Sequence, residues 1–434
     1  MRRMQGSALE APKDLNATRL AWRSLALLLL INLFNYVDRQ ILAAVEKPIS
    51  EELSLSKAQT GQLYSAFLVA YMLLSPLFGV LGDRMRRWAI IGIGVLMWSL
   101  ASGGSGLAKT YLFLLGMRCL IGVGEAAYGP VAPTIISDLF PVQARGKVMA
   151  AFYAAIPVGS ACGYAIGGLF SDHWHRAFFS TLPPGIILGL LCFFMPEPKR
   201  IESSESTPRK PRAADYIVLL KIPSYVLNTL AMAALTFSMG GIAFWMPRYL
   251  VEDRHLEPER ANLIFGGIVA AAGLIATIAG GWAGDKLRDK VRGGYFIVSA
   301  AGMLSGFPLF LLMLVTPFPA CWGVIFLACC CLFFNTGPSN TALANVTRPS
   351  IRATAFAANI LVIHTLGDVI SPTIIGAVAD RFKTTSSSGL SIGFIVVSGL
   401  MLMGGILWAW GARYLDHDTQ RAEHPGGGAG SPAN

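Results

Sequence analysis

The chain has 434 residues, of which 54% are hydrophobic and only 14% are charged. Soluble domains carry about 25% charged residues, so this composition is typical of a membrane protein. The formal net charge of +10 is carried by short segments between long apolar runs. We therefore expect membrane lipids as neighbours, with basic residues in cytoplasmic loops, and no nucleic-acid partner.

Twelve apolar segments are long enough to cross a bilayer as helices. In chain order they are 21–45, 59–82, 88–107, 111–138, 147–170, 176–196, 222–250, 261–283, 295–315, 320–343, 353–379 and 390–413. The predicted fold is an all-α membrane protein with twelve transmembrane helices. We divide it into an N-terminal segment (1–20), a six-helix bundle (21–196), a polar linker (197–221), a second six-helix bundle (222–415) and a disordered tail (416–434).

Most of the 35 Lys and Arg residues lie before the first segment, in alternate loops and in the linker. The positive-inside rule then places both termini and the linker in the cytoplasm. The prediction is a multi-pass protein of an inner or plasma membrane, and we expect a monomer.

A short motif occurs twice, half the chain apart. Gly79–Arg84 ends the second segment, and Gly281–Lys286 ends the eighth. The two bundles are therefore expected to be pseudo-symmetric copies. Charged residues at matching positions are candidates for a cytoplasmic gate between them: Asp83, Arg84, Arg145, Asp285 and Arg352.

A polar stripe interrupts the first segment. Asn32, Asn35 and Arg39 recur at helical spacing, with Tyr36 and Asp38 beside them. Each charge costs roughly 2.5–3.5 kcal/mol at the centre of a membrane helix, so the stripe should face the protein interior. We predict that these residues line a substrate path.

Arg118 and Glu125 stand seven positions apart in the fourth segment, hence on one helical face. Ionisation of the acid could capture or release the arginine, which would couple a proton to a movement. The alternative is a static ion pair that only fixes packing.

Other polar groups lie within the second half. His364 and Asp368 share a helical face near mid-membrane and could act in substrate or proton coupling, or only in packing. Arg248 is a cavity candidate that could instead snorkel to the outer surface. Asn335 and Asn340 could line the cavity or relieve a kink around Pro338.

Motifs of enzymes and cofactor sites are missing from the sequence. There is no phosphate-binding glycine loop, no nucleophile elbow and no paired metal ligands. We expect no enzyme activity, no cofactor and no metal.

Two stretches carry a family resemblance. Gly79–Arg87 resembles the signature motif of the major facilitator transporters, with Arg86 where that family usually has glycine, and Arg118–Glu125 resembles their helix-four motif. Within that superfamily, Phe34–Arg39, Ala126–Tyr128 and Asn345–Pro349 look like the Spinster branch. The resemblance implies the major facilitator fold, a lysophospholipid or sphingoid-type substrate, and coupling roles for Asp38, Arg39, Arg118 and Glu125.

The sequence thus predicts a secondary active transporter that works by alternating access and is coupled to protons. Its substrate would be an amphipathic lipid. Two alternatives stay open: a major facilitator transporter of a drug or small organic anion, and a membrane receptor that does not transport.

Overall fold

The computed structural model describes residues 15–198, 213–348, 351–384 and 387–423, and these ranges contain helices and no strand. The helices of the first half are α1 (Leu15–Ala44), α2 (Glu46–Glu52), α3 (Lys57–Arg84), α4 (Arg87–Ser105), α5 (Tyr111–Ala126), α6 (Ala132–Leu139), α7 (Val142–Leu169), η1 (Ser171–His173) and α8 (Trp174–Phe194). Those of the second half are α9 (Ala213–Leu220), α10 (Pro223–Glu252), α11 (Pro258–Arg288), α12 (Gly294–Val315), α13 (Ala320–Phe333), α14 (Thr336–Asn345), α15 (Arg352–Leu366), α16 (Ser371–Arg381) and α17 (Leu390–Glu423).

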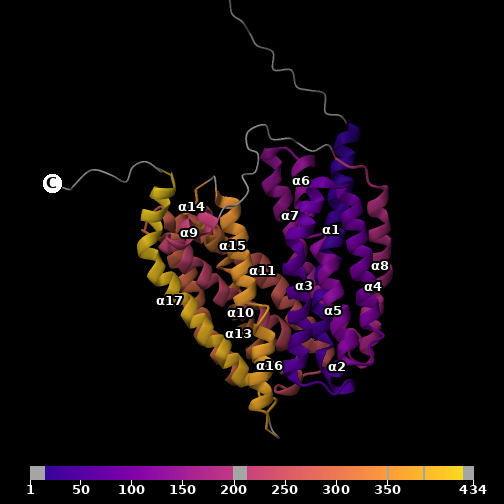
Figure 1. Cartoon of the computed structure of the whole chain (residues 1–434). Helices are drawn as coiled ribbons and strands as arrows, with labels where there is room; N and C mark the ends of the chain where they lie inside the picture. Colours follow the sequence, from indigo (N-terminus) through magenta and orange to yellow (C-terminus); the bar gives the residue numbers. More distant parts are fainter. Residues whose placement is uncertain (1–14, 199–212, 349–350, 385–386, 424–434) are drawn as a thin grey trace, which may run out of the picture.

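Two groups of helices stand side by side (Figure 1). The N bundle comprises α1–α8, in which α1 packs on α7, α4 on α8 and α3 on α5. The C bundle comprises α10–α17, in which α17 packs on α10 and α12. The bundles diverge at the end that carries α6 and α9, here called the linker end, and converge at the end that carries α2 and α16, here called the α2 end (Figure 1).

Eleven helical spans in the described residues are long and apolar enough to cross a bilayer. The remaining predicted span, 111–138, is divided into α5 and α6 by a turn at residues 127–131. Gly129 and Pro130 lie in this turn, and a proline removes a backbone donor and clashes with the preceding helical turn. The expectation of one continuous helix there was wrong.

Two predicted spans of the C bundle are also divided. The span 320–343 breaks between α13 and α14 at Phe334–Asn335, where a kink around Pro338 was expected. The span 353–379 breaks between α15 and α16 at residues 367–370, just before Pro372. That break was not predicted from the sequence.

The linker and the tail contain more helix than expected. Part of the linker, 199–212, lies outside the described residues, but α9 occupies its last third. Helix α17 continues past residue 416, because Asp416 accepts a hydrogen bond from the backbone of Gly293 and Asp418 accepts two from Ser224. These carboxylates cap the starts of α12 and α10, which stabilises helix in a polar sequence.

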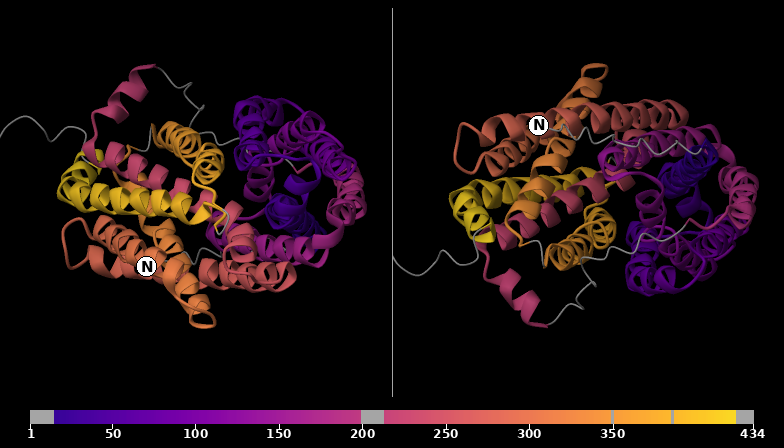
Figure 2. Two further views of the ribbon diagram at one scale, coloured as in Figure 1. Left: turned by 90° about the horizontal axis from the view of Figure 1, so that it is seen from below. Right: turned by 90° about the horizontal axis from the view of Figure 1, so that it is seen from above.

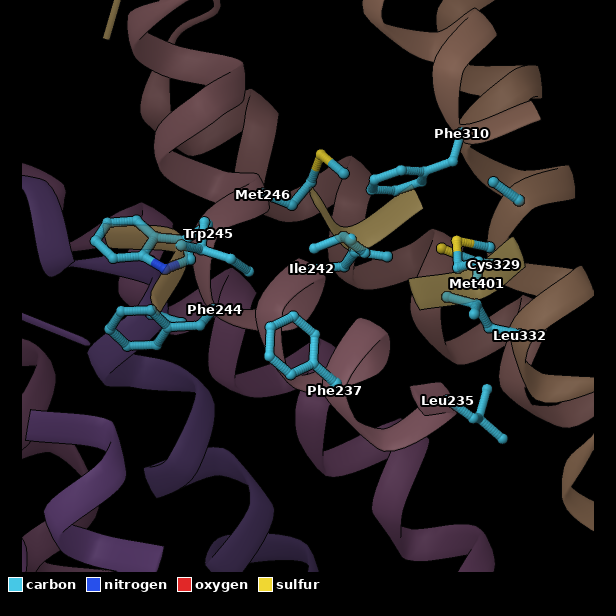
Figure 3. Close-up of a cluster of buried hydrophobic side chains, with 14 of the residues drawn as sticks. Leu235, Phe237, Ile242, Phe244, Trp245, Met246, Phe310, Cys329, Leu332 and Met401 are labelled. Atoms are coloured by element: carbon cyan, nitrogen blue, oxygen red, sulfur yellow. The ribbon is translucent and has the colours of Figure 1, made fainter. Parts of the chain in front are cut away.

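Each bundle has its own apolar core. Trp98, Tyr128 and Phe152 belong to the core of the N bundle. In the C bundle, Ile242, Met246 and Phe310 meet in a buried cluster (Figure 3). The cluster keeps α10 fixed against α12 and α13.

The two bundles also touch along α7 and α11, through small residues. A Cβ atom at Gly266 would lie 3.0 Å from the carbonyl oxygen of Ala161, and one at Gly168 would lie 2.9 Å from the Cβ of Asn262. The helices therefore meet almost backbone to backbone.

Close packing within α5 gives a first prediction. A Cβ at Gly122 would lie 2.3 Å from the backbone oxygen of Phe67 in α3, whereas one at Gly116 would meet nothing within 4 Å. We expect Gly122→Ala to destabilise the protein by about 1–3 kcal/mol and Gly116→Ala to leave it at least as stable. Thermal unfolding of the purified variants, followed by tryptophan fluorescence, checks this. Equal melting temperatures for the two variants would contradict the packing described for α3 and α5.

Candidate functional site: a cavity between the bundles

A cavity of about 1030 Å³ lies between the bundles, and its lining includes residues of α6 and α9 at the linker end. The N bundle contributes α1, α3, α7 and the region around α5 and α6, the C bundle contributes α10 and α15, and α9 lines the cavity beside them. Its wall is mostly apolar, with polar groups gathered on α1, α5 and α15. Among the described residues, α11, α13 and α14 contribute nothing to the lining.

Arg39 and Glu125 form the ion pair of this cavity. The Nε and Nη2 atoms of Arg39 lie 2.8 and 2.6 Å from Oε2 of Glu125. The Arg39 side chain is 16% exposed and the Glu125 side chain is fully buried. The pair thus offsets the cost of placing two charges inside an apolar span.

Aromatic rings surround the same guanidinium. Its carbon atom lies 4.8 Å from the ring centre of Tyr36, 4.9 Å from that of Phe67 and 5.5 Å from that of Tyr71. The negative faces of these rings attract the cation and hold it beside the cavity.

Arg118 does not pair with Glu125 in this conformation. Its side chain is fully buried, and its three nitrogens have no hydrogen-bond partner among the described residues. Seven residues span about 10.5 Å along a helix, which is too far for the contact expected from the sequence. Glu125 instead reaches across to α1, and Arg118 lies over the ring of Phe67 at 5.5 Å.

The polar stripe of α1 is divided between two environments. Asn32, Asn35, Tyr36 and Arg39 line the cavity, and Asn32 donates to the Phe152 carbonyl at 2.8 Å. Asp38 does not line it. Its carboxylate accepts a hydrogen bond from Ser102 of α4 at 3.0 Å and is 2% exposed, because adjacent residues of a helix point in different directions.

His364 and Asp368 make a polar pair on the C-bundle side. Nδ1 of His364 lies 2.9 Å from Oδ1 of Asp368, and His364 lines the cavity. Asp368 lies in the break between α15 and α16, packed against Gly240. His364 faces the cavity from the bundle opposite Arg39.

Three cavity candidates lie elsewhere in this conformation. Asn335 donates to the Cys331 carbonyl at 2.7 Å and Asn340 to the Thr336 carbonyl at 2.8 Å, so both satisfy backbone groups near the α13–α14 break. Arg248 is buried at the α2 end, and no partner for it was expected from the sequence.

The partner of Arg248 comes from the other bundle. Its Nη1 atom lies 2.5 Å from Glu46 Oε1 and 3.0 Å from Ser50 Oγ, both on α2, and its Nε lies 3.0 Å from Glu252. Arg248 therefore ties α10 to α2 across the bundle interface. Glu46 was missed because it falls just after the first predicted span.

A second contact seals the α2 end. The carboxylate of Asp380, at the end of α16, accepts hydrogen bonds from the backbone of Lys57 at 3.1 Å and Ala58 at 2.9 Å. These are the first residues of α3, so an acid of the C bundle caps a helix of the N bundle. Nearby, the hydroxyls of Ser65 and Thr373 lie 2.9 Å apart. Asp380 was not among the gate residues expected from the sequence.

The predicted gate residues at the linker end do not join the bundles. Asp83 and Arg84 are exposed. Asp285 accepts from the Tyr295 hydroxyl at 2.7 Å and Arg352 donates to the Thr347 carbonyl at 3.3 Å, both within the C bundle. The side chain of Arg145 lies outside the described residues. No ion pair between described side chains crosses the interface at this end.

The sequence matches a known family model and several named relatives. Residues 28–372 match the model of the Major Facilitator Superfamily. Protein spinster homolog 3 of Danio rerio is 34% identical over 435 residues, covering 93% of this chain and 87% of the relative. The sphingosine-1-phosphate transporter SPNS2 of Danio rerio is 32% identical over 422 residues, covering 90% and 84%.

Solved structures show the same fold. A bacterial homolog of the human lysosomal transporter Spinster, crystallised in an inward-facing and unoccupied conformation, superposes with a TM-score of 0.83 at 20% identity, covering 95% of this chain and 99% of that one. A D-xylose-proton symporter superposes with a TM-score of 0.69 at 16% identity, covering 89% and 96%.

Two helical bundles around one cavity, with these relatives, define an integral, multi-pass membrane transporter rather than an enzyme. The chain belongs to the Major Facilitator Superfamily and, within it, to the Spinster family.

The cap at the α2 end gives a second prediction. Asp380→Asn keeps the shape but removes the charge that two backbone N–H groups share, so the α2 end should open more often. Asp83→Asn should instead make the linker end open more often, because we expect Asp83 to hold that end closed when the α2 end is open. Distances between spin labels across each end would report the two populations.

Asp289→Asn is the matched control, because Asp289 is exposed and pairs only with its neighbour Arg288. Distance distributions for Asp380→Asn that overlay those of Asp289→Asn would rule out the sealing role.

Proposed function

We propose that the protein is a secondary active transporter that carries a lysophospholipid or sphingoid-type lipid by alternating access, coupled to protons. The observation that carries the proposal is the chemistry of the cavity. A fixed arginine and a carboxylate lie on one side, and apolar side chains of α9, α10 and α15 form the other. Sphingosine-1-phosphate, the substrate in the name of the relative SPNS2, has a charged headgroup and an apolar tail that match these two sides.

The headgroup site is assigned to Arg39. A guanidinium offers a planar fork of donors that fits phosphate oxygens, and Tyr36 and Tyr71 hold its orientation. A bound phosphate would compete with Glu125 for these donors. A small anion would bind Arg39 but would make no contact with the apolar wall. A neutral drug would leave the ion pair between Arg39 and Glu125 in place.

Alternating access is supported by the unequal ends of the molecule. The α2 end is held by Arg248–Glu46 and by Asp380, while the linker end is open to the cavity. We assign the linker end to the cytoplasm, because most of the Lys and Arg residues of the loops belong to that end. Both termini then lie in the cytoplasm, and we propose that the protein acts as a monomer.

Proton coupling is assigned to Glu125. When a headgroup takes Arg39, the Glu125 carboxylate is left buried without that partner. A buried unpaired charge is costly, and binding a proton removes it. The return of Arg39 after release of the substrate would expel the proton. Arg118, seven positions away, adds a fixed positive charge to the same region.

The headgroup assignment yields a third prediction. Arg39→Lys should weaken binding of lysolipids more than binding of the corresponding headless fatty alcohols, because a point charge replaces a fork. Wild-type affinity should rise with tail length by at most about 0.8 kcal/mol per CH₂ group. Ligand binding measured by fluorescence quenching over a chain-length series provides the test. If affinity did not change with tail length and short organic anions bound tightly, the result would favour a transporter of organic anions instead.

The coupling assignment yields a fourth prediction. Glu125→Gln cannot take up a proton, so its uptake of lysolipid into liposomes should lose the dependence on a pH gradient. Exposed Asp289→Asn should keep that dependence. A gradient response equal to wild type in Glu125→Gln would move the coupling site to the His364–Asp368 pair.

A further inference from the structure

Helix α10 loses one hydrogen bond of its backbone ladder at Pro247. The proline lies inside the helix, and it has no N–H group to donate. In an α-helix that N–H would bond to the carbonyl four residues earlier, which is the carbonyl of Ala243. The Ala243 carbonyl therefore has no donor at the usual place in its own helix.

The missing donor comes from the other bundle. The hydroxyl of Tyr164, on α7, donates a hydrogen bond to the carbonyl oxygen of Ala243 at 2.6 Å. The Tyr164 side chain is fully buried, and its ring packs edge-on against Phe265 of α11, with 5.1 Å between the ring centres. A hydroxyl of the N bundle thus completes a helical turn of the C bundle.

The completed turn lies directly before the residue that closes the α2 end. Arg248 follows Pro247 in the chain and pairs with Glu46 of α2 across the interface. In the same stretch, Phe244 packs against Tyr64 of α3, with 5.3 Å between the ring centres. Figure 3 shows Phe244 apart from the side chains that form the core of the C bundle. This stretch of α10 is therefore contacted by α7, α3 and α2 of the N bundle.

The hydrogen bond between Tyr164 and Ala243 crosses the surface along which the bundles would separate. Viewed from the α2 end, the bundles lie side by side and meet where α10 and α11 approach α7 (Figure 2, left). A tilt that opened this end would carry Tyr164 away and leave the Ala243 carbonyl to water. An unpaired carbonyl inside an apolar span is costly. The hydrogen bond therefore favours the conformation in which the α2 end is closed.

We propose that Tyr164 is a positioning residue of the transport cycle: its hydroxyl replaces the hydrogen bond that Pro247 removes from α10, and so holds Arg248 against α2. This inference rests on the alternating access of the proposed function, and it is independent of the substrate. Because of the proline, one turn of α10 is complete only while the bundles touch. With an N–H group at position 247, the turn would be complete in both conformations, and the hydroxyl would add nothing to closure.

The test is a double-mutant cycle on the full-length protein in lipid nanodiscs, measured by distances between spin labels across the α2 end. Tyr164→Phe keeps the ring and its contact with Phe265 but removes the donor, so the ratio of open to closed populations should rise about threefold to tenfold. In a Pro247→Ala background the Ala243 carbonyl regains a donor in its own helix. There, Tyr164→Phe should change the ratio by less than about twofold.

Tyr225→Phe is the matched control for this measurement. The Tyr225 hydroxyl also donates to a buried backbone carbonyl, that of Ala355 at 2.9 Å, but both residues belong to the C bundle. The bond does not cross the interface, so its loss should leave the distances across the α2 end as in the wild type.

Two outcomes would overturn the role of Tyr164. Its distances could overlay those of Tyr225→Phe, or Tyr164→Phe could open the α2 end equally with and without Pro247→Ala. Uptake of lysolipid into liposomes separates this inference from the proposed substrate. If uptake is absent while the populations change as expected, the lipid proposal fails and the role of Tyr164 stands. If no variant populates an open α2 end at any pH, alternating access fails and the role of Tyr164 with it.

Discussion

The cost of placing charge inside an apolar bundle shapes this protein more than any other constraint. Arg39 stands in α1 and Glu125 in α5, and each of these charges is stabilised by the other. Breaking such a pair leaves a buried charge without compensation, which typically costs 3–5 kcal/mol. In the proposed cycle, a ligand or a proton would replace whichever partner leaves, and this exchange would link substrate binding to proton movement.

The same constraint explains how the α2 end is sealed. Arg248 is almost fully buried between the bundles, and two acids from different helices surround it. The Asp380 carboxylate accepts hydrogen bonds from the free N–H groups at the start of α3. These contacts exist only while the bundles touch. Asp380 ends α16 beside the start of α3, whereas Asp83, at the other end of α3, is exposed at the linker end, where the bundles diverge.

Much of the fold could be predicted from the sequence because membrane spans are long and uniform. The spans, the duplication and the polar face of α1 follow from apolar length and helical period. The breaks in the helices were harder to predict. Pro130 lies in the turn after α5 and Pro372 at the start of α16, but Pro76 and Pro157 lie inside unbroken helices. Composition alone does not tell a proline that breaks a helix from one that a helix tolerates, because neighbouring helices determine whether the backbone groups freed by the proline find new partners.

Pairings within the site were less predictable than the residues themselves. Arg118 and Glu125 share a face, yet Glu125 bonds to α1, since the contact depends on how α1 and α5 are placed in space. Asp38 and Arg39 are adjacent in sequence but face a neighbouring helix and the cavity respectively. The contacts of Glu46 and Asp380 join residues far apart in the chain, and no local pattern marks them.

The seam between α7 and α11 has a mechanical consequence. Gly168 and Gly266 bring α7 and α11 close to each other's backbone, and Tyr164 of α7 packs edge-on against Phe265 of α11. In the proposed cycle, the small residues would let the two helices tilt on each other with few changes of rotamer. The seam would then serve as the axis about which one bundle turns against the other.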